Sequence, residues 1–552
     1  MNSLHTRLQE WVPVSRRSKH ISFALVLIGA SLDNINVGGS IAIASSVERH
    51  FNTDSPTASW TLSAYALTLG SFIILAGKLT DILGPKRVFM IGCQCSAILA
   101  LICAVIESEI IVLIVFRALQ GVLASLLVPS MFAVAHAYYG GTKHMMIALT
   151  MVMLMLTCSN GLGLVIGGAL SLTNVGYKGL YYFSFALGTA VSVTLYFIMY
   201  PVGTDVNSKN MHLKNLDFPG TFMIIVGVLL VILGLTEGGE SWKKPAAYVP
   251  IPVGFVIILC ALYFELVYIQ NYKNKVDSLR QETLPTTQKD ERLLNKPDWR
   301  YDILMILPRE AFEITNFIVF VSSMSLLYAS FVIGFALEVQ YAQVIVGDNN
   351  LIAALKSLPL ILGTTVGALL SKESLIYKVG MKRVVVGAMT ANVACAVWTS
   401  YRDYTVKNNF WKFTLVPMFI FGFFVSTYFN VYINALMRRT PGHLQGTVSG
   451  FLQTCGQVGI CVGNALVATV LGVLAPVTTE AIREQYNQRF KHAYIMMYSV
   501  QAAVAAILLF VKDQKSADAP TEEVSSEKEA EEEQPSEKEA EEEQTSSEAT
   551  MA

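Results

Sequence analysis

Charged residues interrupt the apolar stretches of this sequence at positions where a proton could be exchanged. Arg117 and Gln120 lie in the stretch RALQGVLASLLVP, and Asp33 lies about eleven residues into the first apolar stretch. An ionised side chain is costly in hydrocarbon, so it normally faces a partner or a wet cavity. At about 1.5 Å per residue Asp33 and Arg117 fall at similar depths. We expect them to pair until Asp33 takes up a proton; a structural pair, or an Asp33 turned toward the outer entrance, are the alternatives.

A second group of charged residues lies in the string GKLTDILGPKRV, from Gly77 to Val88. Its glycines permit a tight turn, and the Asp81 carboxylate suits the positive end of a helix or a basic side chain. A plain, positively charged turn at the inner membrane surface is the alternative interpretation. A weaker copy, YKVGMKRV, begins at Tyr377 and indicates an internal repeat of two halves. The candidate residues of the loop are Gly77, Lys78, Asp81, Gly84, Lys86 and Arg87.

Small and polar residues recur elsewhere at helical spacing. In SNGLGLVIGGAL the glycines Gly163, Gly167 and Gly168 allow close helix packing, which we expect against a neighbouring helix or against the opposing half. Ser426, Asn430 and Asn434 follow at a spacing of four, which places them on one helix face. Such stripes either join helices or line a cavity, and the spacing alone leaves both possibilities open.

These residues lie on a chain whose composition suits a membrane. Of its 552 residues 53% are hydrophobic and only 15% are charged. A helix needs about 20 apolar residues to cross roughly 30 Å of hydrocarbon. The sequence therefore predicts an all-α polytopic membrane protein with fourteen spans, at 22–46, 58–77, 87–106, 110–137, 145–170, 178–200, 218–238, 248–271, 313–337, 351–371, 383–401, 412–436, 446–474 and 493–511.

The charges of the connecting segments indicate an orientation. With the N-terminus in the cytoplasm, inner segments hold 28 Lys and Arg residues and outer loops hold 10, so both termini are expected to be cytoplasmic. Residues 512–552 carry 15 acidic residues against 4 lysines and repeat SEKEAEEEQ. That composition cannot bury a core and predicts a disordered tail. The apolar patch Ile303–Leu307 predicts a short helix on the membrane surface.

Several classes of function are not expected from this sequence. It contains no Walker loop, which argues against ATP-driven pumping, and no Ser-His-Asp constellation of an enzyme near a membrane face. Its eight cysteines lie inside apolar stretches without metal-ligand spacing. We therefore expect no enzyme activity, no metal site and no cofactor.

The motifs together resemble those of the major facilitator superfamily. The string from Gly77 resembles its Gly-x-Leu-x-Asp-x-x-Gly-x-Lys-Arg loop, and that at Arg117 resembles the Arg-x-x-Gln-Gly motif of its proton-coupled members. Fourteen predicted spans, Leu307-Pro308 and PGHLQGTVSGFLQT from Pro441 resemble the fungal fourteen-span drug:proton antiporter family, with the closest likeness to its aminotriazole and boron resistance branch. The string containing Gly163 resembles the antiporter signature Gly-x-x-x-Gly-Pro-x-x-Gly-Gly, but Leu164 replaces its proline.

The resemblance implies two six-helix halves with a substrate cavity between them. It divides the chain into a cytoplasmic N-terminus (1–20), the N-terminal half (21–200), two inserted helices (201–272), a cytoplasmic loop (273–312), the C-terminal half (313–511) and the tail (512–552). Cavity-facing helices of this superfamily correspond to the first, fourth, ninth and twelfth spans. The candidate cavity residues are then Asn36, Ser325, Tyr328, Ser426, Asn430 and Asn434.

The function expected from these features is the export of small toxic molecules, such as drugs and aminotriazole- or borate-like compounds, by a proton-coupled carrier. The partners would be a small-molecule substrate, protons and the lipid bilayer, with no nucleic acid. A monomer in the plasma membrane is expected, with the vacuolar membrane as alternative. The alternative is a vacuolar or plasma-membrane transporter of basic amino acids or iron chelates. A positively charged cargo would favour an acidic cavity, and Asp33 is the one clear intramembrane acid in the sequence. A nutrient sensor on the same fold, signalling through the tail, is the third possibility.

Overall fold

The computed structural model describes residue 13 and residues 17–511, except residues 54, 143, 203–214, 282–300, 302, 306–308, 349, 372–378, 403–404, 406–408, 473–476 and 478. In this part of the chain the regular structure is helical, apart from an isolated parallel bridge between Leu216 and Leu304. The predicted tail, most of the predicted N-terminal segment and Tyr377 of the loop copy lie outside the described residues.

The first six predicted spans each coincide with a helix or a helix pair. The fourth is divided because Pro129 has no N–H to bond the carbonyl of Ser125, where the first helix of the pair ends. The helices are α2 (Lys19–Phe51), α3 (Ser55–Leu83), α4 (Pro85–Val105), α5 (Ile110–Ala124), α6 (Leu127–Tyr139), α7 (Met145–Ser171) and α8 (Lys178–Ile198).

The last six predicted spans follow the same pattern. Prolines again lie at the first positions of the helices that resume after a break, as Pro359 and Pro417 do. The helices are α16 (Phe317–Tyr341), η5 (Ala342–Val346), α17 (Asn350–Lys356), α18 (Leu358–Leu370), α20 (Met381–Ser400), η6 (Phe410–Leu415), α21 (Val416–Met437), η7 (Gly442–Leu444), α22 (Gln445–Leu471) and α23 (Glu480–Leu508).

Gly84 and Gly380, the aligned glycines of the two loop strings, share one backbone conformation. They precede α4 and α20 with φ, ψ of 87°, 141° and 93°, 136°. Residues with side chains rarely adopt a positive φ, so both turns require glycine. The weak sequence repeat is therefore also a repeat of local structure.

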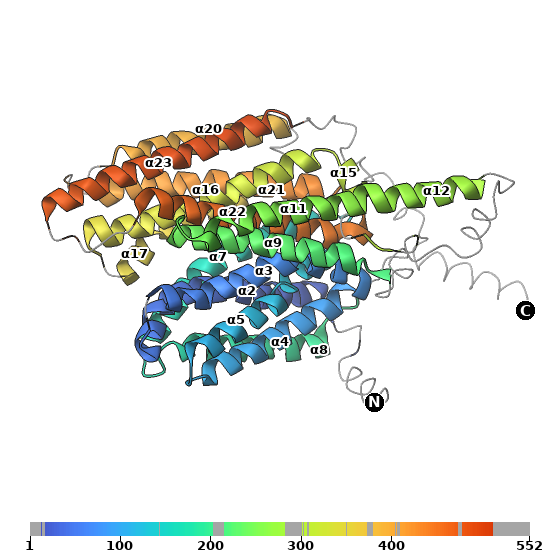
Figure 1. Ribbon diagram of the computed structural model, residues 1–552, viewed down its shortest axis with the longest axis horizontal. Helices are drawn as coiled ribbons and strands as arrows, with labels where there is room; N and C mark the ends of the chain where they lie inside the picture. Colours follow the sequence, from blue (N-terminus) through green and yellow to red (C-terminus); the bar gives the residue numbers. More distant parts are fainter. Residues whose placement is uncertain are drawn as a thin grey trace, which may run out of the picture.

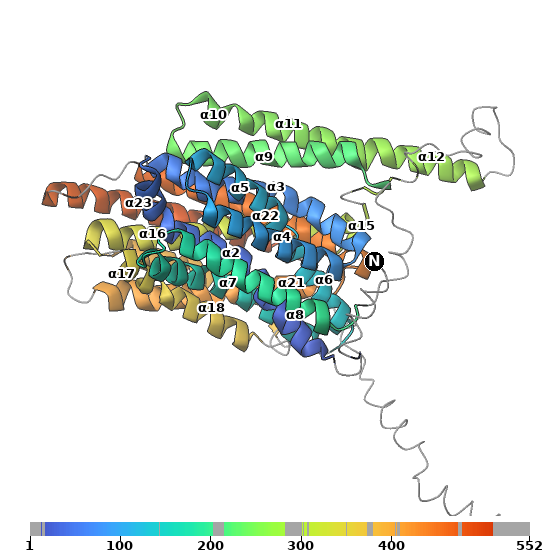
Figure 2. The same ribbon diagram turned by 90° about the horizontal axis from the view of Figure 1, so that it is seen from below.

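Between these two sets lie the helices of the predicted insertion. They are α9 (Phe218–Glu240), α10 (Pro245–Tyr248), α11 (Pro250–Tyr263), η4 (Phe264–Ile269) and α12 (Gln270–Gln281), followed by α15 (Arg309–Glu313). Figure 1 shows α9, α11 and α12 between the blue N-terminal helices and the yellow-to-red C-terminal helices, and Figure 2 shows them as a layer along one side of the bundle. α9 contacts both α3 and α22. The inserted helices therefore cover a seam between the first and last sets of helices.

Eleven helical segments are long and apolar enough to cross a membrane in the described part of the chain. The other three predicted spans correspond to α18, α20 and α23. The apolar helix Leu358–Leu370 is short, α20 begins with charged residues, and the first half of α23 is polar. All fourteen predicted segments thus overlap helices, although these three differ in length or polarity from a typical span.

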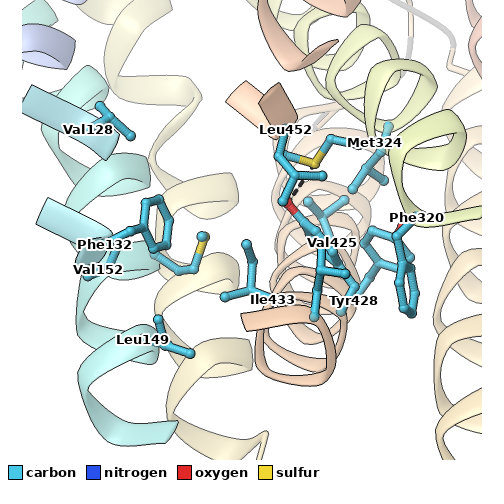
Figure 3. Packing of buried hydrophobic residues seen from close by; sticks show 14 of the residues in the cluster. Val128, Phe132, Leu149, Val152, Phe320, Met324, Val425, Tyr428, Ile433 and Leu452 are labelled. Atoms are coloured by element: carbon cyan, nitrogen blue, oxygen red, sulfur yellow. Dashed lines mark hydrogen bonds between the residues drawn. The ribbon is translucent and has the colours of Figure 1, made fainter. Parts of the chain in front are cut away.

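The two sets of helices are packed together at the end of the bundle that carries the Gly77–Val88 loop, which we call the loop-motif end. Phe132 of α6 and Leu149 of α7 belong to the same buried cluster as Ile433 of α21 and Leu452 of α22. Figure 3 shows Phe132 and Leu149 pointing toward Ile433 across the space between the two sets. Close packing of this kind excludes water.

The prediction of a short surface helix at Ile303–Leu307 is wrong for those of its residues that the structure describes. Ile303 and Leu304 are not helical, and the Leu304 N–H donates to the carbonyl of Asn215 at 2.6 Å. Pairing with the segment before α9 satisfies the backbone here in place of a helix. Within the predicted cytoplasmic loop 273–312, the structure describes helical residues up to Gln281, the end of α12.

Candidate functional site

Asp33 is buried on α2 among the first six spans. Its Oδ1 accepts a hydrogen bond of 2.6 Å from the hydroxyl of Tyr65 on α3, and the residue is only 4% exposed. Away from water, a change in the charge of a carboxyl group has a large electrostatic effect on its neighbours. This environment suits a group that binds and releases a proton.

Arg117 on α5 is fully buried, and neutral groups satisfy its guanidinium. Nε donates to the Thr61 carbonyl at 3.0 Å. Nη1 donates to Oε1 of Gln120 at 2.8 Å, and Nη2 donates to Oγ of Ser40 at 2.7 Å. The guanidinium carbon lies 4.3 Å from the centre of the Tyr65 ring, within cation–π range. The bonds fix Arg117 without using a carboxylate.

The predicted direct pair between Asp33 and Arg117 is therefore wrong. Both residues are described, and no ion pair joins them; Tyr65 contacts both, through its hydroxyl on one side and its ring on the other. The similar depths estimated from the sequence correctly placed both residues at one site. They gave no sign of the tyrosine, because Tyr65 lies in an apolar stretch where aromatic residues are common.

Asp81 connects the end of α3 to the start of α22. Its Oδ1 accepts the N–H of Gly446 at 2.8 Å, and its Oδ2 accepts the N–H and the hydroxyl of Thr447 at 2.8 and 2.6 Å. Free N–H groups and the positive end of the helix dipole favour a carboxylate at this position. Of the two partners considered from the sequence, Asp81 contacts the helix end.

Gly77 lies in the same contact. A Cβ added at Gly77 would lie 2.2 Å from the carbonyl oxygen of Gly446, and one added at Gly446 would lie 2.4 Å from that of Gly77. Only glycine at both positions lets the backbones of α3 and α22 approach this closely. Of the other loop residues, Lys78 is buried, Lys86 partly buried and Arg87 exposed.

The glycines of α7 serve a different contact. Gly163 and Gly167 face the backbone of α2, where added Cβ atoms would lie 2.5 Å from the Ile35 carbonyl and 2.7 Å from Cα of Gly39, and Gly168 is more open. They pack against a helix of the same half. Gly161 faces the opposing set instead, with an added Cβ 2.2 Å from the side chain of Ile361.

The candidate cavity residues do not converge on one space. Asn36 accepts a hydrogen bond from Ser184 of α8 at 3.1 Å. Asn430 donates to the carbonyl of Ala368 on α18 at 3.3 Å, and Asn434 donates to the Asn430 carbonyl at 2.7 Å. Ser426 is buried on the same helix. The Asn36 and Asn430 contacts join helices of the same half, and the Asn434 contact lies within α21.

On α16 the candidates face α22. The Tyr328 hydroxyl lies 3.5 Å from Oε1 of Gln453, and the Ser325 carbonyl would lie 2.0 Å from a Cβ at Gly459. Ser325 and Tyr328 are both partly exposed. They remain candidate substrate contacts.

The structure contains a buried ion pair that the sequence did not predict. Glu338 of α16 and Arg402 beyond α20 are 2.8 Å apart and 2% exposed, and the Arg402 guanidinium lies 4.4 Å from the Tyr341 ring centre. Glu338 is thus a second buried acid in an apolar helical segment, in addition to Asp33, which was the one acid expected there from the sequence. The signal was weak, because Glu338 lies at the end of its apolar stretch and Arg402 in a predicted loop. Glu338 and Tyr341 border a cavity of about 330 Å³.

The comparisons with known proteins agree with this architecture. The family model described as Major Facilitator Superfamily matches residues 21–464. The uncharacterized MFS-type transporter EfpA of Mycobacterium tuberculosis is 24% identical over 47% of this chain and 46% of its own. The aminotriazole resistance protein of Saccharomyces cerevisiae is 22% identical over 44% of each chain, and that yeast's low affinity ammonium transporter is 28% identical over 44% of this chain and 48% of its own.

The matches cover somewhat less than half the length of each of these relatives. The solved human organic anion transporter MFSD10 (TETRAN) superposes with a TM-score of 0.56 over 89% of this chain and 100% of that chain. At 11% identity this likeness concerns the fold alone. The family match covers most of the sequence, and the chain therefore belongs to the major facilitator superfamily of membrane transporters.

Proposed function

We propose that this transporter is a proton-coupled exporter of small toxic molecules that works by alternating access. The observation that carries the proposal is the buried Asp33, held by Tyr65 beside the fully buried Arg117. Protonation would remove the negative charge near Arg117 and release the Tyr65 hydroxyl from its acceptor. These changes can favour one arrangement of the helices over another. The proton gradient would supply the energy without a cofactor.

The loop-motif end would be the cytoplasmic gate. Asp81 holds the start of α22, and Gly77 lies directly against Gly446, so this end is closed. The excess of Lys and Arg in the segments expected on this side supports a cytoplasmic position, with both termini on the same side. Separation of α3 from α22 would admit cargo from the cytoplasm. We place the protein, as a monomer, in the plasma membrane.

The proposed cargo is a drug-like or an aminotriazole- or borate-like molecule. The printed name of the yeast aminotriazole resistance protein supports this class. A cationic cargo, which the ammonium transporter's name would suggest, is less favoured, because the buried acid Glu338 is already balanced by Arg402. Tyr328 and Ser325 on α16 remain the residues proposed to contact the cargo.

Transport by vesicles tests this function. Inside-out vesicles with an imposed proton gradient should accumulate aminotriazole or a fluorescent drug, and Asp33→Asn should abolish the part that depends on the gradient. Glu109→Gln removes an exposed acid before α5 and should leave transport unchanged. Gradient-driven accumulation by Asp33→Asn at the wild-type rate would show that Asp33 is not the coupling site.

A further inference from the structure

The inserted helices bring two buried carboxyl groups together at the loop-motif end. Asp217 caps α9, Glu265 lies on the π-helix η4, and both are 0% exposed. A Cβ added at Gly220 would lie 2.2 Å from Oδ2 of Asp217 and 2.9 Å from Oε1 of Glu265. The two oxygens therefore face a common point. Single turns of π-helix are frequent at functional sites.

One of these carboxyl oxygens has no fixed hydrogen-bond donor among the described residues. Oδ1 of Asp217 accepts the Gly220 N–H at 2.9 Å, whereas Oδ2 is buried and has no partner among the described residues. The neighbouring Glu265 can donate a hydrogen bond to it only when protonated. Burial raises the pKa of Asp217, against the opposite effects of the Gly220 N–H and Glu265. The arrangement suits two carboxyl groups that share one proton.

Lys78 of α3 is a buried cation that interacts with this pair. It is 3% exposed and within electrostatic reach of Glu265, and also of Asp81 and Glu310. Lys78 therefore connects the pair with the carboxylate that holds α22. α22 itself carries no charged residue. Other charged or titratable groups in this region, among the described residues, include His443, 3.3 Å from Glu310, and Lys273, whose ammonium donates to the Ile303 carbonyl.

We propose that Asp217 and Glu265 form a second proton-binding site, and that their shared proton stabilises the closed loop-motif end through Lys78. With one proton, the single negative charge of the pair is balanced by Lys78. Loss of that proton adds a second buried negative charge near Lys78 and Asp81, which weakens the closed arrangement. By linkage, closure is favoured below the titration midpoint of the pair and weakens as the pH rises through it.

Proton binding is tested directly by infrared spectroscopy of the full-length protein in lipid nanodiscs. As the pH is raised, the wild type should lose the infrared signal of a protonated buried carboxyl group. Glu265→Gln and Asp217→Asn should lack that signal. The Asn side chain retains an oxygen to accept the Gly220 N–H. Glu237→Gln, at the far end of α9, is the matched control and should titrate as the wild type does. Wild-type titrations in both pair variants would overturn the proposal.

The connection to closure is tested by amide hydrogen exchange at Gly446 and Thr447, whose N–H groups Asp81 accepts. After correction for intrinsic rates, protection in the wild type should fall as the pH rises, and Glu265→Gln should flatten this dependence. Titration of Asp81 alone would have the opposite sign, because its carboxylate strengthens the contact. An unchanged pH dependence in Glu265→Gln would refute the coupling. The proposal that this pair stabilises closure rests on the proposed gate. Neither experiment uses cargo, so a failure of the export assay and a failure of the proton-binding assay would be distinguishable.

Discussion

Two tyrosines beside Arg117 differ in what their hydroxyl groups do. Tyr65 donates to Asp33 at 2.6 Å, whereas the buried hydroxyl of Tyr181 has no partner in the described part of the chain, although its ring also lies near the guanidinium, at 5.4 Å. A hydrogen bond to a charged group contributes about 1.5–3 kcal/mol, a factor of roughly 10 to 160 in an equilibrium. We predict that Tyr65→Phe lowers proton-driven transport in vesicles at least about tenfold.

Tyr181→Phe is the control for this substitution. It keeps the ring and removes a hydroxyl that has no partner among the described residues, so transport should stay near the wild-type rate. Equal losses in both variants would mean that the rings matter and the hydroxyl of Tyr65 does not.

The pair formed by Glu338 and Arg402 makes a prediction about stability. Removal of one partner leaves a buried charge without its counterion, which costs about 3–5 kcal/mol. Arg402→Met should therefore lower the thermal unfolding temperature strongly, as measured by fluorescence in detergent. The double variant with Glu338→Gln should recover part of the loss, because it no longer buries an unpaired charge. A double variant no more stable than Arg402→Met would contradict an electrostatic origin.

Single residues of the site could be predicted where their chemistry is unusual in hydrocarbon. The cost of burying charge identified Asp33 and Arg117, and the turn pattern identified Asp81. The groups that complete these contacts are Tyr65 and the backbone N–H groups of Gly446 and Thr447. These groups have no unusual sequence signature. They lie 32 to 366 residues from their partners along the chain, and only tertiary packing brings them into contact.

At the scale of helices, the contact of α3 with α22 can be opened by one methyl group. A Cβ at Gly77 would lie 2.2 Å from the backbone oxygen of Gly446, so Gly77→Ala must move the two helices apart. We predict at least about tenfold faster amide exchange at Gly446 and Thr447, equivalent to a loss of about 1.4 kcal/mol in closure.

The matched control is Gly387→Ala on α20, where an added Cβ would meet nothing within 4 Å. Alanine also has the higher helix propensity, so this variant should fold and exchange as the wild type does. If Gly77→Ala exchanged no faster than Gly387→Ala, the two helices would not be held together by the glycine contact.

The helices themselves were predictable because apolar length alone defines most of them. Sequence reasoning was weakest where a helix mixes environments. α23 begins at Glu480 with a polar half, thirteen residues before the predicted span. Likewise, Ile303 and Leu304 looked like a surface helix, but their apolar side chains suit the segment that pairs with Asn215 before α9 equally well. Composition cannot distinguish those outcomes.

For the whole molecule, the position of the proposed gate depends on which end faces the cytoplasm, which the fold alone does not determine. The distribution of Lys and Arg predicts that the turn between α6 and α7 lies inside and the turn between α4 and α5 outside. Exposed residues are available in both turns, His144 and Ser108. In intact cells a membrane-impermeant maleimide should label Ser108→Cys, and it should label His144→Cys only after permeabilisation. The unsubstituted protein, with its eight native cysteines, gives the background.

The reverse labelling pattern would have a specific consequence. The contact made by Asp81 would then close the outer end, and the same helix movements would admit molecules from outside. Exchange for an inward-moving proton would still drive export, but the cytoplasmic entrance would then lie at the opposite end of the bundle. The labelling experiment therefore determines which end of the bundle is the cytoplasmic gate, and it does so before any cargo is known.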